Sequence, residues 1–421
     1  MARGYYALTR ITDYGPYITK LILPLPERVK EVPPDSFSVY VERLDDKGDV
    51  MLLPKSWMAA DDREPSRGYL SVRDAYPADP AGDRQDEGEY LVLELEYGPT
   101  KPLSALVSAP NGLNVFIHPR HFVTQTKPIQ GEETVLTGLS YDFLLENRMP
   151  EVAVFRNATS SFREPLNYGY FVPQELSATP RPLLVWLHGA GEGGIDPTVA
   201  YAANKVTNLA SPKIQKIFGG AYVLAPQTRT FWMNDGTGEY GRTGKSIYGE
   251  ALKALIDEFV ERNPGVDRNR IYIGGDSNGG FMTMRMILDY PNTFAAAFPV
   301  CEALYDETIT EEQLMGIRDL PIWFTHAKND PVVKPEDSVL PTYRRLIAAG
   351  AKNVHFTFWD CIRDIHEGFR DEKGEPFEYL GHFAWIPMLN DDCRTDFDGK
   401  PVTLGGREVS LLEWLACQRK D

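Results

Sequence analysis

The chain has few of the residues that disulfide frameworks and metal centres require. Its four cysteines, Cys301, Cys361, Cys393 and Cys417, are too few and too scattered along 421 residues for a disulfide framework or a zinc site. Cys361 and Cys393 would pair only in an oxidising compartment, and buried free thiols are the alternative. His366 and Glu367 lack the second histidine of a zinc helix, and Asp396 and Asp398 match only part of a calcium loop, so we expect no metal.

The chain also lacks long apolar runs and an excess of positive charge. No window approaches the roughly 18 consecutive apolar residues that a membrane span needs. The start, MARGYYALTRITDYG, has no apolar stretch or cleavage site of a signal peptide. The net charge of −16 opposes binding to a phosphate backbone. We therefore expect no membrane span, no nucleic-acid partner and a cytoplasmic location, or a secreted one if a leader has been trimmed from this chain.

The first part of the chain, residues 1–127, consists of short β-rich runs separated by turn residues. The runs include SFSVYVERLD, GYLSVRDAY, EYLVLELEYG and LNVFIHP. In EYLVLELEYG, Leu91, Leu93 and Leu95 recur with the period of two that is typical of a strand with one buried face. Many short strands without helical periodicity predict an all-β sandwich domain, followed by a linker over 128–149.

From residue 150 to 421 the pattern changes to strands that alternate with helices. Short, nearly continuous apolar runs lie in PLLVWLHG, AYVLAPQ, RIYIGG, AAAFPV, LPIWFTHA and NVHFTFWD, as in a parallel sheet covered on both faces. Between them, YGEALKALIDEFVERN carries Leu252, Ile256 and Phe259 on one helical stripe. This alternation predicts an α/β domain whose functional groups collect at the carboxyl ends of its strands.

The stretch IYIGGDSNGGFM places a serine where a strand gives way to a helix. Ser277 lies between Gly275 and the pair Gly279 and Gly280. A nucleophilic serine at such a turn adopts a strained backbone, and glycines leave room for it. The following helix also directs free N–H groups and partial positive charge at the site.

Three further stretches supply partners for this serine. LLVWLHGAGEGG ends a strand in a glycine-rich turn, where the N–H of Ala190 can face a developing oxyanion together with the N–H of Asn278. Asp330 follows a strand in IWFTHAKNDPVV, and His382 follows the last strand in YLGHFAWIP. Ser277, Asp330 and His382 occur in the chain order of the α/β-hydrolase catalytic triad.

These motifs carry a family resemblance. HGAGEGG, GDSNGG, HAKNDPVV and GHFAW together resemble the α/β-hydrolase esterases related to polyhydroxybutyrate depolymerases and to the prolyl oligopeptidase catalytic domain. ITDYGPYITKLILPL and AYPADPAG resemble the front domain of the branch with an N-terminal immunoglobulin-like domain. The resemblance implies an α/β-hydrolase fold, a mostly parallel sheet with helices on both faces, preceded by an all-β immunoglobulin-like sandwich. Gly193 stands where the related motif more often has arginine.

Other histidines compete for the role of base. His366 also follows the final strand, but charged residues surround it and indicate a solvated loop. His382 has apolar neighbours such as Phe383, which suit a pocket that excludes water. His188 and His326 lie at strand ends, where we expect them to be structural.

The aromatic residues near the predicted site are candidates for a substrate pocket. Trp232 and Tyr240, in TRTFWMNDGTGEYG, follow a strand on its carboxyl side, and Phe383 follows His382. We expect these three side chains to line an acyl or alcohol pocket, with ordinary loop packing as the alternative for Trp232 and Tyr240.

The sequence thus predicts a serine hydrolase that cleaves short acyl or aryl esters of small molecules through an acyl-enzyme, without a metal or organic cofactor. Two alternatives remain open. A serine peptidase of the prolyl oligopeptidase kind shares the triad, and a non-enzymatic binding protein would use the β-sandwich. The oligomeric state is also open.

Overall fold

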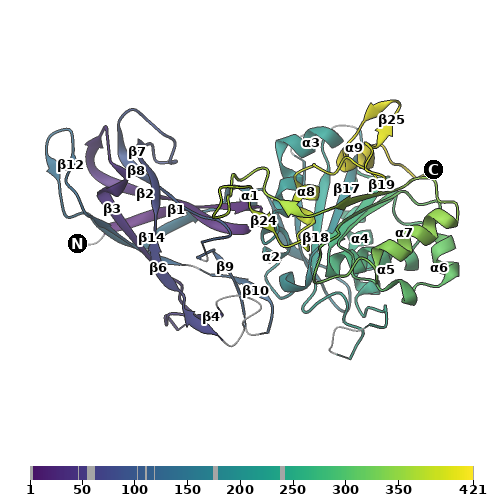
Figure 1. Ribbon diagram of the computed structural model, residues 1–421. Helices are drawn as coiled ribbons and strands as arrows, with labels where there is room; N and C mark the ends of the chain where they lie inside the picture. Colours follow the sequence, from purple (N-terminus) through teal and green to yellow (C-terminus); the bar gives the residue numbers. More distant parts are fainter. Residues whose placement is uncertain are drawn as a thin grey trace. The chain divides into compact units, whose positions relative to one another are not determined.

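The computed structural model describes residues 3–45, 47–54, 62–101, 103–109, 111–117, 119–173, 179–237 and 242–420. It divides the chain into two compact units (Figure 1). The first unit comprises Met1–Val107 and Val115–Pro150. The second comprises Glu151–Asp421 together with the short segment Ser108–Asn114. A stretch inside the predicted front domain therefore belongs to the second unit.

The first unit is built almost entirely of strands. Its elements, with β9 and β10 crossing the unit boundaries, are β1 (Arg3–Thr12), β2 (Gly15–Val29), a 3-10 turn (Pro34–Ser36), β3 (Phe37–Glu42), β4 (Leu52–Pro54), β5 (Arg63–Pro65), β6 (Arg67–Leu70), β7 (Val72–Ala78), β8 (Gly88–Leu95), β9 (Leu106–Ser108), β10 (Asn114–Phe116), β11 (Arg120–Gln125), β12 (Ile129–Gln130), β13 (Val135–Leu136) and β14 (Ser140–Arg148). Eight of these strands form a sheet in the order β6-β3-β11-β14-β1-β2-β8-β7.

The core of this unit lies inside the curled sheet. Strand β3, near one end of the sheet order, contacts β7 at the other end, so the sheet folds over on itself. Leu91 and Leu93 of β8 are fully buried in this core, as their alternation predicts. Val92, on the opposite face of β8, is also buried, because it packs against Ile22 and Tyr76 in a second apolar cluster.

The predicted linker over 128–149 is wrong for most of its length. It contains β12, β13 and β14, and β14 pairs in parallel with β1 and antiparallel with β11. The strand was missed because most of its side chains are exposed or half-buried, which weakens the alternation of apolar and polar residues that reveals a strand.

The second unit alternates strands and helices. Its elements are α1 (Pro150–Ala153), β15 (Arg156–Thr159), β16 (Asn167–Phe171), β17 (Arg181–Leu187), α2 (Val199–Ala202), α3 (Pro212–Phe218), β18 (Tyr222–Gln227), α4 (Gly249–Arg262), β19 (Val266–Asp276), α5 (Asn278–Asp289), β20 (Ala296–Val300), α6 (Glu311–Gly316), β21 (Ile322–Ala327), α7 (Val339–Ala348), β22 (Val354–Trp359), β23 (Ile362–Arg363), β24 (Glu378–Tyr379), α8 (Trp385–Leu389), β25 (Thr403–Leu404), β26 (Arg407–Glu408) and α9 (Leu411–Ala416), with 3-10 turns at Ala190–Glu192, Val206–Ala210 and Asp306–Thr308.

Eight of these strands form one sheet in the order β15-β16-β18-β17-β19-β20-β21-β22. The strands from β18 to β22 are parallel, and β15 and β16 form an antiparallel edge. The carboxyl ends of β17, β19, β20 and β21 therefore meet at one edge of the sheet. The residues that follow these four strands are brought together there.

Helices cover both faces of this sheet within the unit (Figure 1). Ile271 and Ile273 of β19 belong to the core that α4, α5 and α7 close on one face. Tyr272, between them, points to the other face, where its ring contacts Phe218 of α3 and its hydroxyl donates to the Gln418 carbonyl. None of the helices in the described part of the chain combines the length and the hydropathy that crossing a membrane requires.

Replacing a core residue of the central strand tests this packing. Ile273 is fully buried, so Ile273→Ala should leave a cavity and lower the free energy of unfolding of the second unit by about 2–5 kcal/mol. Ile347→Ala removes the same atoms from a residue of α7 that is 46% exposed and should cost far less. Urea unfolding followed by tryptophan fluorescence measures both variants, and equal losses would contradict the assigned core.

Candidate active site

Ser277 occupies a strained turn between β19 and α5. Its φ of 55° and ψ of −111° lie outside the regions that residues with a side chain usually adopt. The turn is held by its backbone, because the Ser277 N–H donates to the Val300 carbonyl at 2.9 Å and the Ser277 carbonyl accepts from Phe281 N–H at 2.9 Å. The hydroxyl is thus presented at the carboxyl edge of the sheet, next to the first turn of α5.

The glycines around Ser277 are required by the close approach of neighbouring backbone. A Cβ on Gly275 would lie 2.3 Å from the Leu187 carbonyl oxygen, and one on Gly279 would lie 1.9 Å from the same atom. A Cβ on Gly280 would lie 2.7 Å from the Val300 carbonyl oxygen. Because the ends of β17 and β20 pack this tightly against the Ser277 turn, only glycine fits at the three positions.

Ser277, His382 and Asp330 lie in a continuous hydrogen-bonded chain. His382 Nε2 is 2.9 Å from Ser277 Oγ, and His382 Nδ1 is 2.8 Å from Asp330 Oδ2. The imidazole is buried against the ring of Trp385, which meets it edge-on. The three side chains come from positions about fifty residues apart in the sequence, and the turns that follow β19, β21 and β24 bring them together.

Asp330 is the most fully hydrogen-bonded of the three. Its Oδ1 accepts the backbone N–H groups of Val332 and Val333 at 2.8 and 3.0 Å. Its Oδ2 contacts His382 and, at 3.0 Å, His326 Nε2. Burial alone would raise the pKa of Asp330, but the hydrogen bonds from the two histidines outweigh burial and hold this pKa well below its ordinary value. The carboxylate therefore stays ionised and orients His382.

The turn after β17 faces the serine. Ala190 begins the 3-10 turn Ala190–Glu192 and, together with Ser277 and Asn278, lines a cavity of about 370 Å³. His188, just before this turn, lies within 2.6 Å of the Gly189 carbonyl through Nδ1 and accepts the Thr228 N–H through Nε2. Burial lowers the pKa of His188 to about 4, so the ring is neutral. His188 thus shapes the turn and does not contact Ser277.

Two of the three predicted pocket residues, Trp232 and Phe383, do not line the cavity beside Ser277. Trp232 is fully buried against His188 and does not line the cavity, because its backbone N–H is drawn inward to the side-chain oxygen of Asn278. Met233, the next residue, lines the cavity instead. Phe383 packs on Trp385 and is absent from the lining, and Tyr240 lies outside the described residues.

Sequence reasoning did not anticipate the other residues that line the cavity. They combine apolar and charged side chains from the turns after β18, β20 and β21: Met233, Arg242, Ala303, Tyr305, Val332, Val333, Lys334, Asp337 and Ser338. Val332 and Val333 end the stretch HAKNDPVV, but the other lining residues belong to no recognisable motif. For those residues, position after a parallel strand was the one available signal, and every loop at this edge of the sheet shares it.

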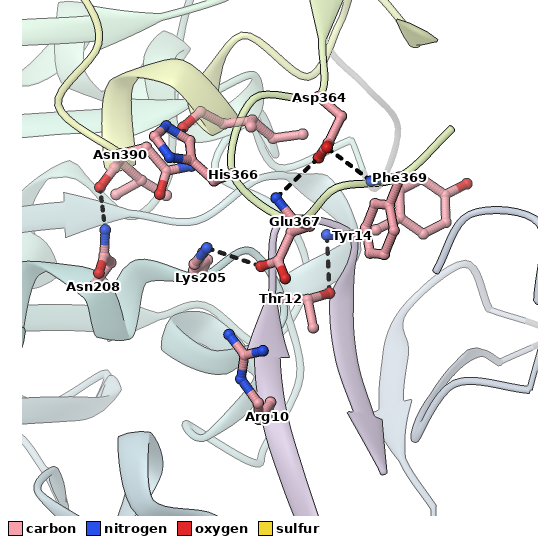
Figure 2. Close-up of polar contacts among 12 residues, drawn as sticks. Arg10, Thr12, Tyr14, Lys205, Asn208, Asp364, His366, Glu367, Phe369 and Asn390 are labelled. Atoms are coloured by element: carbon pink, nitrogen blue, oxygen red, sulfur yellow. Dashed lines mark hydrogen bonds and ion pairs between the residues drawn. The ribbon is translucent and has the colours of Figure 1, made fainter. Parts of the chain in front are cut away.

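His366 lies in a loop that other contacts hold in place. Its Nε2 is 2.8 Å from Asp392 Oδ2. Asp364 accepts the backbone N–H of Glu367, and the Glu367 carboxylate pairs with Lys205 at 3.1 Å (Figure 2). These contacts hold the loop of His366 in place, and none of them involves Ser277.

Glu192 is buried beside the candidate site, although sequence reasoning gave it no role. Asn114, from the short segment of the second unit that precedes the eight-stranded sheet in sequence, donates through Nδ2 to Glu192 Oε1 at 2.9 Å. A Cβ on Gly193 would lie 1.7 Å from the Thr230 carbonyl oxygen and 3.3 Å from a methyl group of Leu113. An arginine therefore cannot occupy position 193 in this turn, which explains the departure from the related motif.

The four cysteines are all free thiols, so Cys361 and Cys393 are not paired. Cys393 is buried and lies 3.6 Å from the Thr325 hydroxyl. Within the described ranges, no group of three or more histidine, cysteine or acidic residues is placed to hold a metal ion.

Comparison with known proteins relates both units to esterases. Residues 4–137 match the family described as "Esterase Ig-like N-terminal domain", and residues 170–357 match "Phospholipase/Carboxylesterase". The second match includes Ser277 and Asp330 and ends before His382. A solved structure described as a thermostable esterase shares the fold, with a TM-score of 0.75, 24% identity and 100% coverage of both chains. The predicted fold class is confirmed.

A curated relative is also similar over part of its length. Poly(3-hydroxyalkanoate) depolymerase C of Paucimonas lemoignei is 31% identical over 144 residues, which are 32% of this chain. The chain spans only 30% of the length of that relative.

The crowding at position 193 can be tested with two glycine variants. Gly193→Ala should displace the turn that carries Ala190, because a Cβ has no room beside Thr230, and should slow the labelling of the enzyme by a fluorophosphonate at least tenfold. Gly316→Ala, at the end of α6, adds a Cβ to open space and should change nothing. Unaltered labelling of Gly193→Ala would contradict the observed packing of this turn.

Proposed function

The chain is an α/β-hydrolase with an esterase immunoglobulin-like N-terminal domain, and we propose that it cleaves carboxylic esters through Ser277, His382 and Asp330. The observation that carries this proposal is the hydrogen-bonded chain of the three side chains, with distances of 2.9 and 2.8 Å and a buried, ionised Asp330 at its end. Three side chains hydrogen-bonded in this order can remove a proton from a serine hydroxyl at neutral pH.

The proposed reaction begins with attack of Ser277 Oγ on the ester carbonyl carbon. His382 Nε2 takes the hydroxyl proton as the new bond forms, and Asp330 stabilises the resulting imidazolium and fixes its tautomer. The tetrahedral intermediate then loses the alcohol, which leaves with the proton from His382. Water, activated by the same imidazole, releases the acid from the acyl-enzyme.

The oxyanion of the tetrahedral intermediate is proposed to lie between the backbone N–H groups of Ala190 and Asn278. Both residues line the cavity beside Ser277. Asn278 is also the first residue of α5, whose N-terminus supplies partial positive charge. Removal of one oxyanion donor costs serine hydrolases about 10²–10³ in kcat, so these groups would contribute much of the rate.

The size and lining of the cavity support a small ester as the substrate. A volume of about 370 Å³ is at the low end of the range for ligand sites. Val332, Val333 and Met233 provide apolar contact for a short acyl or aryl group. We propose short acyl or aryl esters as the substrate class.

Variants of the serine and of two histidines test the assignment. Ser277→Ala and His382→Ala should each lower kcat for p-nitrophenyl acetate by about 10⁴-fold or more, because the nucleophile or its base is lost. His366→Ala should keep most of the activity, since its imidazole bonds to Asp392 and not to Ser277. Near-normal turnover by folded Ser277→Ala would contradict the proposal.

A comparison of leaving groups separates the esterase from a peptidase of the prolyl oligopeptidase kind. An acyl p-nitrophenyl ester and the matching p-nitroanilide share the acyl group and differ only in the bond that is cleaved. We expect kcat/KM for the ester to exceed that for the anilide by at least about 10³-fold. The p-nitrophenolate leaves readily as an anion, whereas the anilide nitrogen must be protonated before it can leave. Comparable values would favour the peptidase.

A further inference from the structure

Two buried carboxyl groups lie next to each other behind the candidate oxyanion turn. Asp276 immediately precedes Ser277, and Glu192 ends the turn that begins at Ala190. Both side chains are almost completely buried. A Cβ on Gly189 would lie 2.8 Å from Asp276 Oδ2 and 2.8 Å from Glu192 Oε2, so both oxygens approach the same point. Gly189 leaves the space in which the two carboxyl groups face each other.

Among the described residues, the surroundings of the pair supply hydrogen-bond donors but no positive charge. Asn114 donates to Glu192 Oε1 at 2.9 Å, and Asn204 donates to Asp276 Oδ2 at 3.4 Å. Asp276 Oδ1 has no hydrogen-bond partner among the described residues. Two ionised carboxylates this close, without a cation, would repel each other strongly in a buried site.

The other titratable groups near the pair do not compensate its charge. His188 is neutral, and burial holds the pKa of the Cys301 thiol well above its ordinary value, so that group is neutral too. Asp330 adds a further negative charge. Burial raises the pKa of Glu192, and burial together with the charge of Glu192 raises that of Asp276.

We propose that Glu192 and Asp276 share one proton in a hydrogen bond that holds the oxyanion turn against the turn of Ser277, with Asn114 fixing the orientation of Glu192. The pair consists of positioning residues, since neither carboxyl group lines the cavity. It connects the two backbone segments that carry the N–H groups of Ala190 and Asn278. This inference rests on the proposed function for its effect on rate, but the shared proton itself does not depend on that function.

An isosteric amide at position 192 keeps a hydrogen-bond donor toward Asp276 but removes the second acidic group. In Glu192→Gln the side-chain amide can donate to Asp276 and still accept from Asn114, so kcat/KM for p-nitrophenyl acetate should stay within about threefold of wild type. Glu192→Ala removes the connection and should lower kcat about 10²-fold with little change in KM. Asn114→Ala should lower kcat by about tenfold. Glu312→Ala, at an exposed residue of α6, is the control and should have no effect.

The pH profile gives a readout that a merely structural role would not move. As pH rises, the pair loses its shared proton, the two carboxylates repel, and the oxyanion turn is displaced. Wild type should therefore lose kcat/KM at alkaline pH in a one-proton step that Glu192→Gln lacks. If Glu192→Gln loses as much activity as Glu192→Ala, or keeps the same alkaline step, the proposal is wrong.

Infrared spectroscopy tests the proton without reference to catalysis. At pH 7 the difference spectrum between wild type and Glu192→Gln should contain the C=O stretch of one protonated carboxyl group. Glu302, whose pKa burial raises to about 8, contributes equally to both proteins and cancels. An absent band would overturn the shared proton even if the enzyme is an esterase. If the band is present but ester hydrolysis does not depend on Ser277, the shared proton is supported and the proposed function is wrong.

Discussion

The contact between the end of β17 and the start of α5 is the constraint on which the candidate site depends. The Leu187 carbonyl lies so close to Gly275 and Gly279 that any side chain at either position would collide with it. Ser277 lies between these two glycines in an unusual backbone conformation, and Ala190, just after β17, lines the same cavity. The Ser277 turn, the turn of Ala190 and the first turn of α5 therefore all lie at this one packing contact of β17 with β19 and α5.

Hydrogen bonding to Asp330 is the second fixed element of the site. Its carboxylate is satisfied by two backbone N–H groups and two histidines, which keep it ionised in spite of burial. His382 is thereby oriented from one side while Ser277 meets it from the other. The hydrogen bonds around Asp330 favour its charged form, whereas the described surroundings of Asp276 and Glu192 contain no cation and oppose charge on that pair.

The parts of the molecule that were predictable share a strong local signal. The buried strands of the second unit are nearly continuous apolar runs, and Ser277, Asp330 and His382 each lie in a motif whose residue types the proposed chemistry requires. Long-range contacts left no such signal. Nothing in the sequence around Asn114 indicates that it bonds Glu192, 78 residues away, and the aromatic character of Trp232 did not reveal that its ring is buried. Strand β14 was missed because exposed strands lack a clear apolar alternation.

The most direct test of the account is to trap its covalent intermediate. The enzyme is mixed with p-nitrophenyl acetate, quenched in acid within its first turnovers, and analysed by intact mass and peptide mapping. The account predicts one acetyl group per chain, on Ser277, which disappears as the substrate is consumed. Acetylation of a different residue, or ester hydrolysis with no acetylated Ser277 at any time, would contradict it.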